Sequence, residues 1–157
     1  MFTYDWYNGS PADYPLVTEV NPGAGFLEIT HYGTKPADLS GWTVSASGRE
    51  WAIPKGTMLT PGKPLVLVAD KSAFQARFGP TVTPVELPGL TLGAPRDTVR
   101  LRKGATLIDT VAWGEALPGW KLPAGAVCRS NPGKDTNSHL DWTLASKGTP
   151  GAAGCGL

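Results

Sequence analysis

The chain has 157 residues, of which 41% are hydrophobic and 17% are charged. This length and composition predict one ordered domain and exclude an intrinsically disordered chain. The 14 basic and 13 acidic residues leave a net charge of +1, so binding to a polyanion requires a local patch. The longest apolar run, residues 65–69, has the length of a strand, and no membrane insertion is expected.

The first fifteen residues form an aromatic-rich arm. No basic and apolar leader is recognisable in it, so no signal peptide is expected in this sequence. Burial of its rings is sufficient to order the arm, either on its own domain or on a second copy of the chain. We therefore divide the chain into an arm, residues 1–15, and a domain, residues 16–157. The candidate assembly contacts are Phe2, Tyr4, Trp6 and Tyr7.

Short apolar segments separated by turns follow the arm. Residues 16–20 and 26–32 flank an Asn-Pro-Gly turn and predict two adjacent strands. In the segment 39–46 apolar and polar residues alternate, which predicts a half-buried strand with Trp42 in the core. Further strands are expected at residues 50–53 and 65–68.

One short helix is expected over residues 73–78. Ser72 and Gln75 have the spacing of a capping box, and Gly79 supplies the stop. The Pro-rich residues 82–92 predict a loop or a sheet edge.

The segments 96–102 and 106–113 flank Lys-Gly-Ala and predict a β-hairpin with a three-residue loop. About nine short strands separated by turns favour an all-β, antiparallel β-sandwich.

Five segments in this order resemble the lamin tail domain in its bacterial branch, an immunoglobulin-like module. The most specific is Asp-Leu-Ser-Gly-Trp at 38–42, which couples a turn to a core aromatic. The resemblance covers roughly residues 16–152. It implies an immunoglobulin-like sandwich that acts in interaction or tethering and has no shared catalytic residues. The segments are residues 17–29, 37–44, 74–79, 97–114 and 135–152.

Cys128 and Cys155 are the two cysteines of the chain and allow one intramolecular disulfide. Such a bridge would fasten the tail. The alternative is two reduced, buried thiols. We expect the disulfide and therefore a secreted or cell-surface protein, because disulfides are rare in the cytosol.

The sequence contains no recognisable pattern of catalytic residues. Only His31 and His139 are available as a histidine base, and neither lies in a Gly-x-Ser-x-Gly motif. The spacing of the glutamates does not distinguish a glycosidase pair from solvated strand residues. We expect no enzyme, no catalytic residue and no cofactor. The glutamates considered are Glu19, Glu28, Glu50, Glu86 and Glu115.

Alternating polar side chains at Asp135, Asn137, His139 and Asp141 are superficially similar to a calcium loop. The EF-hand comparison fails because Leu140 stands where the loop requires glycine. Short polar side chains of this kind more often hold their own backbone in turns. We therefore predict a structured turn and no metal.

A basic stripe is expected on the strand 96–102, where Arg96, Arg100 and Arg102 share one face. It is either a solvated outer face or a contact for a polyanion such as DNA or a sulfated glycan. Trp113 and Trp120 are candidates for stacking on a sugar, but most tryptophans of a sandwich lie in the core.

Three classes of function compete. We rank first a non-catalytic extracellular or cell-surface interaction module that binds a protein partner or a polyanion. A structural subunit that self-associates through the arm comes second, and an enzyme comes last.

Overall fold

The computed structural model describes residues 14–114, 126–130, 135–136, 138–144, 148–152 and 154–155. These residues form twelve strands, one α-helix and one short 3-10 helix. In this part of the chain no helix is long and apolar enough to cross a membrane. The predicted all-β class with one short helix is confirmed.

The larger sheet has six strands in the order β12-β11-β1-β2-β7-β8. Its neighbours are antiparallel except β7 and β8, which run parallel, so the expected purely antiparallel sandwich has one parallel edge. The strands are β1 Pro15–Asn21, β2 Phe26–His31, β7 Leu65–Val68, β8 Val85–Glu86, β11 Val127–Arg129 and β12 Trp142–Leu144.

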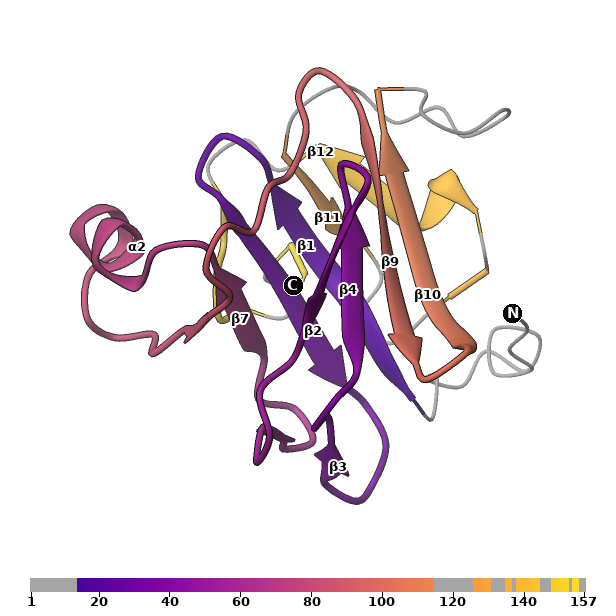
Figure 1. Ribbon diagram of the computed structural model, residues 1–157. Helices are drawn as coiled ribbons and strands as arrows, with labels where there is room; N and C mark the ends of the chain where they lie inside the picture. The colour runs from indigo at the N-terminus through magenta and orange to yellow at the C-terminus, as the bar shows by residue number, and fades with distance from the viewer. Residues whose placement is uncertain are drawn as a thin grey trace.

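The second sheet has four strands in the order β10-β9-β4-β5 and lies over the first (Figure 1). Lys103 pairs with Thr106 across the β9–β10 hairpin, so the connecting loop has two residues and not the three predicted. A small two-stranded sheet joins β3 Ala37–Asp38 to β6 Met58–Leu59. The four strands are β4 Thr43–Ala46, β5 Arg49–Ala52, β9 Asp97–Lys103 and β10 Thr106–Trp113.

The core lies between the two sheets. Alternate residues of each strand point inward, as the period of a strand requires, and they form one continuous apolar cluster. Each aliphatic side chain buried in it contributes about 1.5–3 kcal/mol of transfer free energy. The members include Leu27, Leu67, Leu101, Trp113 and the predicted core residue Trp42.

The turn before β4 shows why its motif is specific. Asp38 Oδ1 accepts hydrogen bonds from the backbone N–H of Ser40, at 2.9 Å, and from its hydroxyl. These bonds lower the pKa of Asp38. Gly41 follows with φ +76°, a conformation that favours glycine. The turn thereby delivers Trp42 to the core.

Helix α2, Lys71–Phe78, packs on the outer face of the larger sheet (Figure 1). Phe74 and Phe78 lie edge-on to Phe26, with ring centroids 5.9 and 5.5 Å away. The helix begins earlier than predicted because Asp70, not Ser72, is the N-cap residue. Its side chain accepts from Ala73 N at 2.9 Å.

Candidate functional site

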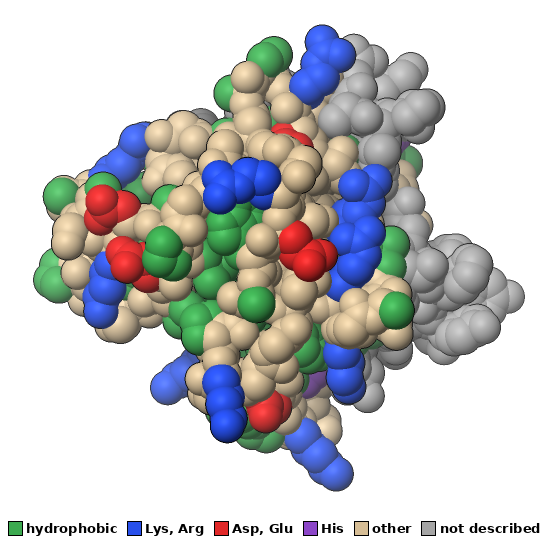
Figure 2. All heavy atoms as spheres, in the orientation of Figure 1, with side chains coloured by type: hydrophobic (Ala, Val, Ile, Leu, Met, Phe, Trp, Pro, Cys, Tyr) green, Lys and Arg blue, Asp and Glu red, His purple; other side chains and the backbone are tan. Residues whose placement is uncertain are grey.

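The arginines of the predicted basic stripe lie along β9 on the outer face of the four-stranded sheet. Val99 and Leu101 are buried, whereas Arg100 and Arg102 are half-buried and Arg96 is exposed just before the strand. Arg102 Nη1 donates to Ser45 Oγ on neighbouring β4 at 3.1 Å. Figure 2 shows Lys and Arg side chains gathered in a column over β9.

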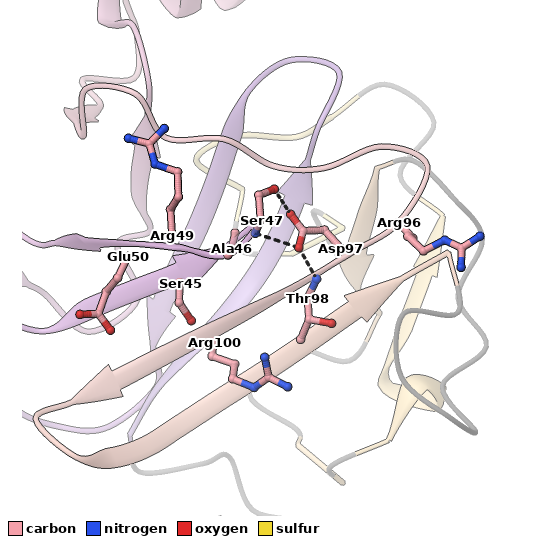
Figure 3. A pocket seen from close by; sticks show the side chains of 10 residues that line it. Ser45, Ala46, Ser47, Arg49, Glu50, Arg96, Asp97, Thr98 and Arg100 are labelled. Atoms are coloured by element: carbon pink, nitrogen blue, oxygen red, sulfur yellow. Dashed lines mark hydrogen bonds between the residues drawn. The ribbon is translucent and has the colours of Figure 1, made fainter.

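Asp97 anchors this face at the end where β9 begins. Its carboxylate accepts from the N–H of Gly93 at 2.7 Å, of Thr98 at 2.7 Å and of Ser47 at 3.0 Å, and from the Ser47 hydroxyl. These bonds tie the β4–β5 hairpin to β9 (Figure 3). Ser47 has φ +52°, which few non-glycine residues adopt, and Asp97 holds it there.

An open cavity of about 510 Å³ lies beside this contact. Its lining residues include three arginines, Arg49, Arg96 and Arg100, and two carboxylates, of which Asp97 is already occupied by its donors. In Figure 3 the three arginines extend in different directions around Asp97 and do not converge on one point. The arrangement therefore suits an extended anionic surface better than a single small ion. The second carboxylate is Glu50.

A buried ionic cluster surrounds Arg129 on β11, which is 1% exposed. Its guanidinium donates to Asp109 at 3.0 Å and to the backbone carbonyl of Val17 at 3.1 Å. Asp109 in turn accepts from Val17 N at 2.8 Å. Asp109 belongs to the four-stranded sheet and Val17 to the six-stranded sheet, so the cluster links the two main sheets.

The predicted polar turn completes this cluster. Asp135 and Asp141 lie 3.9 and 3.7 Å from Arg129. Asp141 also accepts from the N–H and hydroxyl of Thr136, both at 2.7 Å. The structured turn is thus confirmed, and these two carboxylates face a guanidinium. Asn137 lies outside the described residues, among which no group of three or more metal-ligating side chains is found.

Burial shifts the acid groups of this cluster. It raises the pKa of Asp109 to about 7, although the Arg129 guanidinium lowers it. It also raises the pKa of the Tyr14 phenol, which donates to Asp135 at 2.9 Å. Both pKa shifts are explained by burial. Asp109 and Tyr14 already have hydrogen-bond partners within the fold.

Two glutamates expected in solvent are buried instead. Glu19 and Glu28 are both 0% exposed because the C-terminal segment, residues 148–152 and 154–155, covers them. Thr149 donates to Glu19 from its N–H at 2.7 Å and from its hydroxyl. Gly151 and Gly154 donate their N–H groups to Glu28, each at 2.8 Å. The pair fastens the segment to the sheet.

The predicted disulfide joins Cys128 to Cys155, with their Cα atoms 5.2 Å apart. It fixes the C-terminal segment to β11 beside the two glutamates. Both thiols are consumed, so neither serves as a nucleophile. Sequence spacing alone gave no indication that the bridge and the glutamates act on the same segment.

Two further sets of candidates have different outcomes. Trp113 is fully buried and its indole N–H donates to Gly93 O at 2.9 Å, so it is a core residue and does not stack on a sugar. Trp120 lies outside the described residues. The same holds for the candidate assembly contacts Phe2, Tyr4, Trp6 and Tyr7.

A family model of the lamin tail domain matches residues 9–115, more than half of the chain. The chain belongs to the lamin tail domain family. The match confirms the resemblance seen in the sequence and agrees with the immunoglobulin-like sandwich. Lamin tail domains are generally non-enzymatic, so membership favours a non-catalytic module. No curated protein matches the sequence.

Proposed function

We propose that this lamin tail domain is an exported interaction module that tethers its parent protein by binding a sulfated glycan on the outer face of β9. The observation that carries the proposal is the unbalanced charge of that face. Arg100 and Arg102 lie on β9 and Arg96 directly precedes it, and the nearby Asp97 carboxylate is occupied by four hydrogen bonds.

The spacing along the strand supports an extended ligand. Residues two apart on one strand face are about 6.8 Å apart, so Arg100 and Arg102 present a short row of two guanidinium groups. Arginine binds sulfate and phosphate groups bidentately and is more weakly hydrated than lysine. A chain that carries repeated sulfates is matched by such a row.

The disulfide supports the location. Cys128 and Cys155 form a bridge, and such bridges persist in oxidising compartments. Sulfated glycans are abundant outside cells, whereas DNA is chiefly intracellular. This favours the glycan over DNA, and direct competition between the two decides.

The test is retention on immobilised heparin at low salt. Replacing Arg96, Arg100 and Arg102 with Ala should abolish retention, because the electrostatic part of polyanion binding depends on the number of charges engaged. Replacing Lys55, Lys63 and Lys71 with Ala removes the same charge from exposed positions elsewhere and should leave retention nearly unchanged.

Three results would count against the proposal. Wild type that flows through the column shows that the arginines are only a solvated face. Equal losses in the two triple variants show a response to net charge alone. Elution by duplex DNA at lower concentration than by heparin assigns the face to nucleic acid.

A further inference from the structure

A second cavity lies at the opposite end of β9 from the β4–β5 hairpin. It has a volume of about 530 Å³, which is within the range of small-molecule sites. Its walls come from the starts of β1 and β3, the end of β2, the residue before β4 and the β9–β10 hairpin. We call it the Lys35 cavity.

The charges that line the Lys35 cavity have one sign. Lys35 and Lys103 belong to its lining, and His31 contributes an imidazole. Its ten lining residues include no aspartate or glutamate. Tyr14, also on the wall, already donates its hydroxyl to Asp135. An anion that enters this cavity would therefore meet cationic groups without a competing carboxylate on the wall.

His31 carries the second observation. It ends β2 and is 6% exposed, and its Nδ1 has no hydrogen-bond partner among the described residues. Its backbone is occupied, because the carbonyl accepts from Gly62 N at 2.9 Å. Buried polar groups in native structures are nearly always paired. Nδ1 is itself shielded from solvent, so His31 is a buried, unpaired polar group in the wall of a cavity whose charged side chains are cationic.

The rest of the wall is apolar. Trp42 and Ile108 form part of it together with two prolines. Lys103 Nζ lies 6.0 Å from the centre of the Trp42 ring, so a cation and an aromatic surface stand side by side. This combination matches a ligand that has a charged group and an apolar body.

We propose that the Lys35 cavity binds a small organic anion. The charged group, a carboxylate or a phosphate or sulfate ester, lies among Lys35, Lys103 and His31. The apolar body rests against Trp42 and Ile108. The site is separate from the arginine face proposed above and does not depend on it.

The binding test uses NMR with benzoate and phenyl phosphate as probes. The chain has two histidines, so the imidazole signals of His31 can be followed with His139 as an internal reference. Both His31 and the Trp42 indole signal should shift saturably. Acetate and inorganic phosphate lack the apolar body, and benzyl alcohol lacks the charge, so each should bind at least about tenfold more weakly. The tighter of the two probes identifies a carboxylate or a phosphate ester as the preferred group.

Variants locate the site. Lys35→Ala, at an exposed position that should not perturb folding, is expected to weaken binding of the tighter probe about tenfold, because a charge-assisted contact is lost. His31→Gln should weaken it as well. Lys71→Ala, on α2, is the matched control and should leave the affinity unchanged. Lys103 is kept in every variant because it borders both this cavity and the arginine face.

The proposal fails if neither probe shifts His31 and Trp42, or if Lys35→Ala and Lys71→Ala bind the probes equally well. It also fails if acetate or inorganic phosphate binds as tightly as the aromatic probes. The two proposals remain distinguishable. The triple arginine variant should keep probe binding, and Lys35→Ala should keep heparin retention, so loss of one function counts only against its own site.

Discussion

Glu19 on β1 lies directly opposite Glu28 on β2, and both buried carboxylates accept hydrogen bonds from the same C-terminal segment. Two like charges in apolar surroundings repel each other and lose hydration. Burial raises the pKa of Glu19 to about 7, with Glu28 adding to the rise and the bonds from Thr149 opposing it. The attachment of the segment is therefore sensitive to protonation.

Glu28→Gln should lower the free energy of unfolding by about 1–3 kcal/mol, because Gly151 and Gly154 donate to different carboxylate oxygens and the amide replaces one of those acceptors with a donor. Urea unfolding measures the loss, and hydrogen exchange of the C-terminal segment should rise with it. Glu50→Gln, at an exposed position on β5, is the matched control, with an expected change within about 0.5 kcal/mol. Similar losses in both variants would contradict the assigned role of Glu28.

The stability of the protein should fall as pH rises from about 4.5 to about 7. Glu19 has a pKa of 4.5 when free and about 7 when buried, so in this window the folded state binds more protons than the unfolded state. Asp109 acts in the same direction. Urea unfolding at several pH values gives the slope, and Glu19→Gln should make it shallower. A slope that is identical in the variant excludes Glu19 as its source.

Arg129→Met should destabilise the fold by about 3–5 kcal/mol, because it leaves Asp109, Asp135 and Asp141 buried without their cation. Adding Asp109→Asn should restore part of the loss, which a double-mutant cycle measures. Arg77→Met, on an exposed position of α2, is the control for removing an arginine. Additive effects of the two cluster substitutions would argue against the cluster as a unit.

Replacing Cys128 and Cys155 together with Ala should lower the free energy of unfolding by about 3–4 kcal/mol, the chain-entropy value for a loop of this size. The sequence separation is 27 residues. Intact mass under non-reducing conditions should lie two hydrogen masses below that of the reduced protein. Free thiols in the non-reduced sample would remove the support for export.

The sequence predicted the sandwich where local pattern and tertiary position agree. The pair β1–β2 is rich in strand-forming residues and flanks a turn, β9 alternates before the turn of its hairpin, and Trp42 follows a turn of fixed chemistry. Strand β11 was not predicted, because an arginine in a short segment normally indicates an exposed position. Arg129 is buried only because three aspartates surround it. Glu19 and Glu28 were expected in solvent for a related reason. Their cover comes from a segment more than 120 residues away, which no local pattern reports.

The candidate sites divide in the same way. The arginine stripe was visible because a strand repeats every two residues. The Lys35 cavity was not, since its lining comes from five separate segments and His31 gives no local sign of an unpaired nitrogen.

The position of the C-terminal segment has a consequence for synthesis. Translation releases β1 and β2 first, and the N–H groups that cap Glu19 and Glu28 come from residues 149–154. Until those residues leave the ribosome, the two carboxylates remain open to water and the part of the outer face around them is uncovered. Cys155 emerges at the same late stage, so the bridge cannot form before the segment that covers this face has been synthesised. A nascent chain stalled before this point carries the sandwich without its cover.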